Sequence, residues 1–152
     1  MPDQPGSTAP PHPPAPSPSR HTARAAAVAA CLDTAVVLAF AGLGRGFHSL
    51  ENPVLGVLAT AWPFLVGLAV AWAAFRVWRR PDAPWPTGIA VWIGSYALGM
   101  ALRAAMGGAT PVPFLLVAFG FLGALFLGWR AIALVAQRVL ARDRSAGARA
   151  QR

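Results

Sequence analysis

Long apolar runs alternate with short polar segments along most of the chain. Each run has about 18–22 residues, so that as an α-helix it would extend roughly 30 Å and cross the hydrocarbon core of a bilayer. We therefore expect an all-α, polytopic membrane protein. Its four transmembrane helices are predicted to form a compact bundle, at about residues 25–44, 54–75, 86–106 and 112–129.

The two ends of the chain differ in composition from the apolar runs. Residues 1–22 are rich in proline with small residues between, a composition that buries little and predicts disorder. After the fourth run, apolar residues alternate with arginine and glutamine at helical spacing. We expect an amphipathic basic extension of that helix to residue 140, along or just below the lipid headgroups. The membrane domain then covers residues 23–140, and residues 141–152 are predicted to be a flexible basic tail.

The overall composition agrees with a membrane domain. Hydrophobic residues make up 56% of the chain and charged residues 12%, against about 25% charged in soluble domains. The formal net charge is +8, and every basic residue is an arginine. These arginines lie at the ends of apolar runs and in the tails, without interleaved aromatic residues. We therefore do not expect nucleic-acid binding, and we interpret the charge as a topology signal and as contact with the lipid bilayer.

The arginines are distributed unequally between the two sides of the membrane. Four spans place both termini on one side. Eleven of the 13 arginines fall on that side, whereas Arg45 and Arg103 fall on the other. Because positively charged segments stay on the cytoplasmic side, we expect a multi-pass protein of the plasma membrane with both termini cytoplasmic.

One carboxylate, Asp33, lies inside the first apolar run. A charge at that depth is costly, so it indicates either a function or a specific partner. Counting residues places Asp33, Ser95 and Tyr96 about 12–15 Å from the cytoplasmic side. One hypothesis makes Asp33 a proton- or cation-binding group in a transport path. The other makes it a carboxyl group that hydrogen-bonds to Ser95 or Tyr96 and fixes helix packing. Arg76 and Arg103 are about 12 Å away along the membrane normal, and we do not expect a direct salt bridge.

A second polar set is predicted on the outer side. Arg45 and Arg103 close the first and third helices there, and His48 lies in the short loop after the first helix. These side chains could flank one shallow polar site, in which histidine could titrate near neutral pH. The alternative is ordinary capping of helix ends and contact with lipid headgroups.

The sequence contains no recognisable catalytic or metal-binding pattern. It has no HExxH, no GxSxG, no phosphate-binding glycine loop and no second carboxylate within an apolar run. The single cysteine, Cys31, lies in the first run and is expected to be a small packing residue. We therefore expect no enzyme activity, no cofactor and no metal.

Several short motifs in the membrane domain resemble an uncharacterised family of small bacterial and archaeal membrane proteins, the domain of unknown function 3054. The resemblance extends over about residues 28–135 and implies four helices, without implying an activity. It also suggests that Asp33, Arg45, His48 and Arg103 belong to one pattern. The motifs that carry it, besides Asp33, are Gly44-Arg45-xx-His48, Leu58-Ala59-Thr60-Ala61-Trp62-Pro63-Phe64, Trp85-Pro86-Thr87-Gly88 with Trp92, Gly99-Met100-xx-Arg103 and Gly128-Trp129-Arg130.

Two functional hypotheses remain from the sequence. The first is a small proton- or cation-linked transporter, acting as a homo-oligomer and using Asp33. A single intramembrane acid in the first of four short helices is similar to the plan of small multidrug-resistance exporters, although those proteins use glutamate. The alternative is a structural or accessory subunit that packs against a membrane partner protein through faces of small residues.

Overall fold

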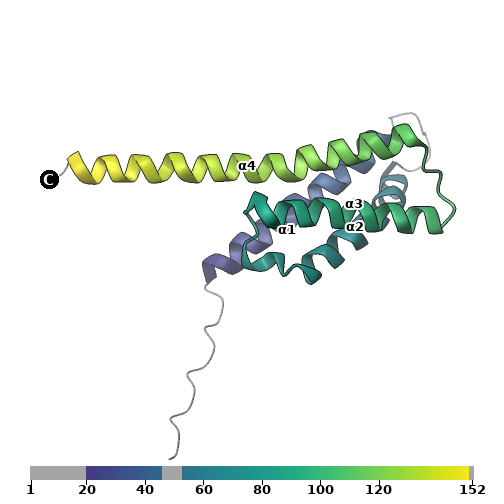
Figure 1. Cartoon of the computed structure of the whole chain (residues 1–152), viewed down its shortest axis with the longest axis horizontal. Helices are drawn as coiled ribbons and strands as arrows, with labels where there is room; N and C mark the ends of the chain where they lie inside the picture. The colour runs from purple at the N-terminus through teal and green to yellow at the C-terminus, as the bar shows by residue number, and fades with distance from the viewer. Residues whose placement is uncertain (1–19, 46–52, 151–152) are drawn as a thin grey trace, which may run out of the picture.

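The computed structural model describes residues 20–45 and 53–150. Within them the chain forms four long helices and two short helical turns, without strands. By length and composition all four helices can cross a membrane, which supports a multi-pass membrane protein. Figure 1 shows α1, α2 and α3 beside the first half of α4, while the rest of α4 extends beyond them. The elements are α1 (Arg20–Arg45), α2 (Pro53–Ala74), η1 (Val77–Arg79), η2 (Pro84–Gly88), α3 (Ile89–Ala105) and α4 (Val112–Ala150).

The predicted all-α architecture is confirmed, and the helix bounds differ mainly at the two ends. Residues 1–19 of the predicted disordered segment lie outside the described residues, whereas α1 already begins at Arg20. Helix α4 continues to Ala150, so that residues 141–150 of the predicted tail are helical. Residues 141–150 contain no proline that would stop the helix.

Helices α2 and α3 pack against each other most extensively. Small residues allow their backbones to approach closely. A Cβ atom added at Gly67 would lie 2.8 Å from the carbonyl oxygen of Ser95, and one added at Gly99 would lie 2.5 Å from the Phe64 ring. Such distances leave no space for a side chain, so these glycines fix the contact between the two helices.

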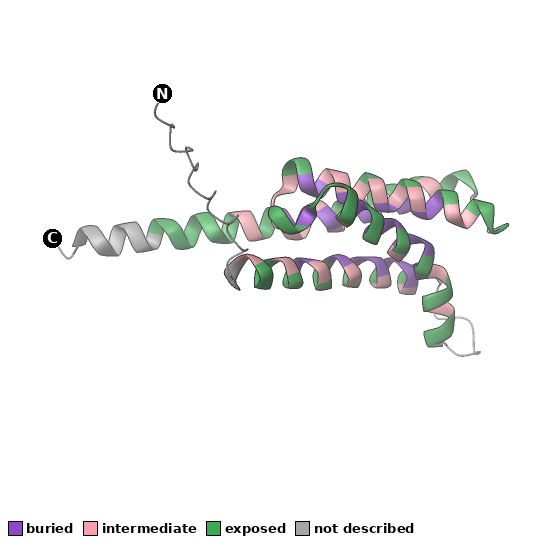
Figure 2. Cartoon of the chain, turned by 90° about the horizontal axis from the view of Figure 1, so that it is seen from below, coloured by how far each residue is buried: buried purple, intermediate pink, exposed green. Residues whose placement is uncertain are grey.

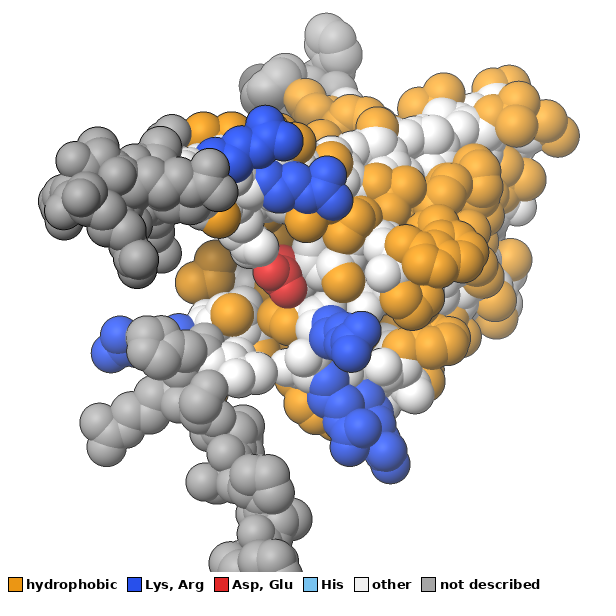
Figure 3. Space-filling view, turned by 60° about the vertical axis from the view of Figure 1, so that its left-hand side comes forward, with side chains coloured by type: hydrophobic (Ala, Val, Ile, Leu, Met, Phe, Trp, Pro, Cys, Tyr) orange, Lys and Arg blue, Asp and Glu red, His pale blue; other side chains and the backbone are white. Residues whose placement is uncertain are grey.

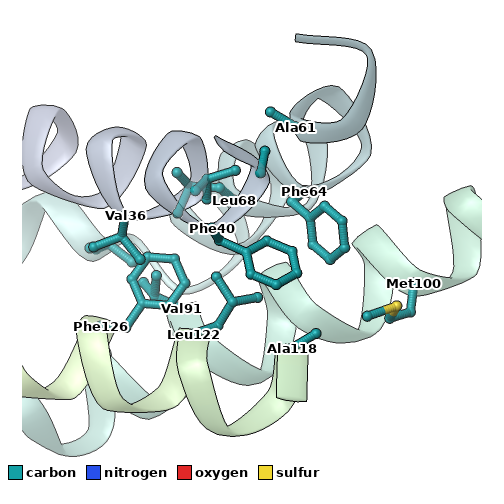
Figure 4. Close-up of a cluster of buried hydrophobic side chains, with 13 residues drawn as sticks. Val36, Phe40, Ala61, Phe64, Leu68, Val91, Met100, Ala118, Leu122 and Phe126 are labelled. Atoms are coloured by element: carbon teal, nitrogen blue, oxygen red, sulfur yellow. The ribbon is translucent and has the colours of Figure 1, made fainter. Parts of the chain in front are cut away.

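An apolar core fills the space between the four helices (Figure 4). Phe40 of α1 and Phe64 of α2 meet edge to face, with ring centroids 5.2 Å apart. Leu122 and Phe126 of α4 are fully buried in the same cluster. Figure 2 shows the buried positions on the facing sides of the helices and the exposed positions on the outside. Many of the exposed side chains are large and apolar, as expected for a surface that faces lipid.

The connection between α2 and α3 lies at the same end of the bundle as the start of α1 and the extension of α4 (Figure 1). We call this the arginine-rich end, because it carries Arg24, Arg76, Arg79, Arg80 and Arg138. The opposite end carries the turn between α3 and α4.

Candidate functional site

Asp33 of α1 forms a buried ion pair with Arg130 of α4. Two hydrogen bonds join the groups side by side: Nη2 donates to Oδ2 at 2.7 Å and Nη1 donates to Oδ1 at 2.8 Å. Both side chains are fully buried, with 0% exposure. Parallel contacts of this kind match the planar guanidinium to the planar carboxylate and fix the orientation of both.

Two tryptophans complete the contacts of the carboxylate. The indole Nε1 of Trp72, near the end of α2, donates to Oδ2 of Asp33 at 3.0 Å. The indole Nε1 of Trp129 donates to Oδ1 at the same distance. A carboxylate has about four lone-pair sites, and each oxygen of Asp33 accepts two hydrogen bonds. The acceptor capacity of Asp33 is therefore fully used by Trp72, Trp129 and Arg130.

The remaining contacts of Arg130 reach the α2–α3 connection. Its Nε donates to the carbonyl oxygen of Pro81 at 3.1 Å, and Nη1 also donates to that of Phe126 at 3.0 Å. Its guanidinium carbon lies 4.3 Å from the ring centroid of Trp129. A Cβ atom added at Gly88 would lie 2.9 Å from Cδ of Arg130, so only glycine leaves room for the arginine stem there. The cluster joins α1, α2, α4 and the α2–α3 connection, and we call it the Asp33–Arg130 site.

The predicted partners of Asp33 are wrong. Ser95 is buried but its Oγ donates to the carbonyl oxygen of Phe64 at 3.1 Å. The hydroxyl of Tyr96 donates to the carbonyl oxygen of Leu115 at 3.2 Å. Both side chains therefore bond helix backbones, while Asp33 is bonded by Trp72, Trp129 and Arg130. The expectation that Asp33 makes no direct salt bridge is also wrong, because Arg130 forms one with it.

The site lies directly beneath the α2–α3 connection. Pro81, which accepts from Arg130, is followed by Asp82, whose Oδ2 accepts a 2.8 Å hydrogen bond from Nε2 of Gln137 on α4. The connection also carries Arg79 and Arg80, which are exposed. A segment this polar belongs at the membrane interface. The ion pair therefore lies next to the α2–α3 connection, at the arginine-rich end of the bundle.

A signal for Arg130 was present in the sequence. The six residues after it, 131–136, are all apolar, so the arginine lies inside a longer apolar helix instead of closing it. The two tryptophans carry no such signal, because tryptophan near a membrane interface is common without any specific partner.

The predicted outer-side set is described only in part. His48 lies outside the described residues, and so does the side chain of Arg45, although that residue ends α1. Arg103 donates from Nε to the carbonyl oxygen of Ala109 at 3.2 Å. Its guanidinium carbon lies 5.1 Å from the ring centroid of Phe114. A joint site of Arg45, His48 and Arg103 stays a prediction.

Arg103 also lines a pocket of about 360 Å³ at this end, together with residues of α1, α2 and the α3–α4 turn. Apart from Arg103 and Thr60 its wall consists of apolar side chains and glycine: Phe40, Gly44, Ala109, Pro111 and Phe114. Within residues 20–45 and 53–150, no three His, Cys, Asp or Glu side chains gather in a way that could hold a metal.

Comparison with known proteins assigns the chain to one family. The family model described as DUF3054, protein of unknown function, matches residues 30–133. This range contains the Asp33–Arg130 site and the four predicted transmembrane helices except for residues 25–29 of the first. No curated protein and no solved structure matches the chain significantly. The match extends over more than half of the 152 residues, and the chain therefore belongs to the DUF3054 family.

Proposed function

We propose that this protein is a non-catalytic structural or accessory subunit of the plasma membrane, with both termini cytoplasmic. In this proposal the Asp33–Arg130 site holds the bundle together and does not carry a transported proton or cation. The observation that supports it is the saturation of Asp33, whose oxygens accept four hydrogen bonds while the side chain is 0% exposed.

Transport through Asp33 would require its carboxylate to exchange a proton or cation with a solvated path. Each such exchange would have to break hydrogen bonds to Arg130 and would leave that guanidinium buried without its counter-ion. Removing one partner from a buried pair costs about 3–5 kcal/mol. A carboxylate that exchanges a proton or cation needs a lone pair that is free to accept it. All the lone pairs of Asp33 are used in hydrogen bonds, which favours the structural hypothesis over transport.

An open face on α4 supports the second half of the proposal, which is association with a membrane partner. Gly120, Ala124 and Gly128 recur at every fourth residue, and a Cβ atom added at either glycine would meet nothing within 4 Å. Small residues inside the bundle are covered instead, since Gly67 of α2 and Gly99 of α3 are tightly packed. Stripes of small residues let helices approach closely in lipid, so the α4 stripe suits a helix of a second copy or of another protein.

The structural role of Asp33 is tested by reconstituting the Asp33→Asn variant in vesicles. We expect proton and monovalent-cation flux equal to that of the wild type, together with a lower free energy of unfolding. Asp82→Asn is the matched control, because it removes the partly exposed acid at the same end. Flux that depends on Asp33, with unfolding unchanged, would favour the transporter and refute this proposal.

The partner surface is tested by Gly120→Leu and Gly128→Leu. An added Cβ atom meets nothing within 4 Å at either position, and leucine favours a helix over glycine, so the variants should fold. We expect native membrane extracts of the wild type to yield a complex heavier than the monomer, which both variants lose. Gly42→Leu is the control, since Gly42 is equally open but lies on α1. A wild type that stays monomeric, or a complex retained in both variants, would count against the α4 face.

A further inference from the structure

A groove lies between α1 and α4 at the arginine-rich end, separate from the buried ion pair. Its volume is about 520 Å³, within the range of about 300–1,000 Å³ that small-molecule sites occupy. The α1 wall includes Val28 and Leu32, and the α4 wall includes Trp129 and Ile132. Figure 3, which turns this end toward the viewer, shows arginine side chains on both sides of a hollow.

The walls of the groove are apolar and exposed in the isolated chain. Val28 is 59% exposed and Ile132 is 72% exposed. Both lie within the stretches of α1 and α4 that are apolar enough for a membrane. A lipid chain is the natural neighbour of such walls, because the surrounding solvent at that depth is hydrocarbon.

The lining of the groove includes one positively charged side chain, Arg24. Arg24 is exposed and lines the groove together with one carboxylate, Asp82, which is hydrogen-bonded to Gln137. Arg79 and Arg80 in the neighbouring connection are also exposed. The field at this end is therefore positive, and basic pockets between membrane helices are the sites at which anionic lipid headgroups bind.

We propose that this groove binds an anionic phospholipid, with one acyl chain between α1 and α4 and the phosphate beside Arg24. The chain would cover the outer side of Trp129, whose indole nitrogen bonds Asp33. This proposal does not depend on whether the protein has a protein partner.

The test uses the full chain, purified in neutral detergent and stripped of lipid. Phosphatidylglycerol is added, and bound lipid is counted by native mass spectrometry while thermal unfolding is followed. We expect one phosphatidylglycerol to remain bound and to raise the melting temperature, whereas phosphatidylcholine and phosphatidylethanolamine do so weakly. Arg24→Gln should weaken phosphatidylglycerol binding by about fivefold, the effect of one arginine at an anionic lipid surface.

Two further variants separate the groove from general surface charge. Ala25→Phe fills its mouth and should abolish binding while leaving the melting temperature in lipid-free detergent unchanged, because Ala25 is exposed. Arg79→Gln removes an exposed arginine outside the groove lining and should change binding by less than about twofold.

Several outcomes would overturn the proposal. Equal loss of binding in Arg24→Gln and Arg79→Gln would indicate general surface charge. Equal binding of phosphatidylethanolamine or phosphatidylcholine would exclude selection by charge. Stabilisation by inorganic phosphate alone would indicate a phosphate site without a lipid chain. A dimer that forms as lipid is removed and is lost in Ala25→Phe would identify a second copy as the occupant.

Discussion

Each end of the bundle contains an arginine that packs into the protein, and the two are held in different ways. Arg130 at the arginine-rich end is 0% exposed and bonds a carboxylate and two backbone carbonyls. Arg103 at the opposite end is only half-buried, bonds the Ala109 carbonyl and stacks over Phe114. One arginine is enclosed with its counter-ion, and the other remains partly in contact with its surroundings.

The difference shows what a buried charge requires in this fold. Enclosing a guanidinium is tolerable only if a counter-ion and further hydrogen bonds compensate for its lost hydration. Arg130 has Asp33 as its counter-ion and bonds a carbonyl of the α2–α3 connection. The carboxylate of Asp33 is in turn bonded by Trp72 and Trp129. The opposite end needs no such set, because apolar contacts such as that between Phe40 and Phe64 hold the helices there. The ends should therefore respond very differently to single substitutions.

The largest effect is expected from Asp33→Asn. The change leaves Arg130 buried without its counter-ion, so the free energy of unfolding should fall by about 3–5 kcal/mol. It can be measured by denaturant titration in detergent micelles. The control Asp82→Asn is expected to cost under about 1 kcal/mol, because that acid is only partly buried and bonds the exposed, uncharged Gln137.

A double-mutant cycle tests the cause of that loss. Arg130→Gln alone should cost about as much as Asp33→Asn, and the double variant should cost much less than the sum of the two, because neither charge is then left alone. Additive costs would mean that the groups stabilise the fold independently, and the comparison of the two ends would lose its basis.

Removing one indole hydrogen bond should have the next largest effect. Trp129→Phe keeps most of the ring but deletes the donor to Oδ1 of Asp33. A hydrogen bond to a charged group contributes about 1.5–3 kcal/mol, and the free energy of unfolding should fall by that amount. Trp92→Phe is the control, since its Nε1 donates to the uncharged carbonyl of Phe119, and it should cost about 1 kcal/mol. Equal losses would show that the charge of Asp33 adds nothing to its indole contacts.

The sequence predicted the fold because length and hydropathy alone identify a membrane-spanning helix. The runs at 25–44 and 54–75 correspond closely to the apolar parts of α1 and α2. The site was harder to predict, since pairing between helices depends on tilt and on where each helix crosses the interface. Arg130 was taken as the end of a span and not as a partner of Asp33. Counting residues from the cytoplasmic ends of the first and third helices placed Asp33 level with Ser95 instead.

The contribution of the α2–α3 connection could not be read from the sequence at all. The connection places the carbonyl of Pro81 against Arg130, and such a backbone contact has no signature in residue type. Gly88 had a partial signal, because it belongs to the motif Trp85-Pro86-Thr87-Gly88 on which the family resemblance rests. The structure shows why glycine is needed at this position, because the side chain of Arg130 packs directly against it.

Gly88→Ala is therefore expected to have an intermediate effect. The added Cβ atom would lie 2.9 Å from Cδ of Arg130 and 3.1 Å from Cδ2 of Leu127. Arg130 cannot move aside without lengthening its bonds to Asp33, so overpacking should cost about 1–3 kcal/mol. Gly120→Ala is the matched control, because it meets nothing within 4 Å, and it should be neutral or stabilising by up to about 1 kcal/mol. A neutral Gly88→Ala would mean that the arginine is held less rigidly than its contacts indicate.

Arg103→Gln should have the smallest effect. The change removes a neutral-acceptor hydrogen bond and a contact over the Phe114 ring, which together contribute about 1–2 kcal/mol at a partly exposed position. No acid is bonded to Arg103 in these contacts, so its loss should leave no counter-charge stranded in the bundle. The free energy of unfolding in the same titration should fall by less than half of the loss in Asp33→Asn. If the two losses were equal, the half-buried arginine would stabilise the fold as strongly as the enclosed one. Enclosure with a counter-ion would then not be what distinguishes the two ends.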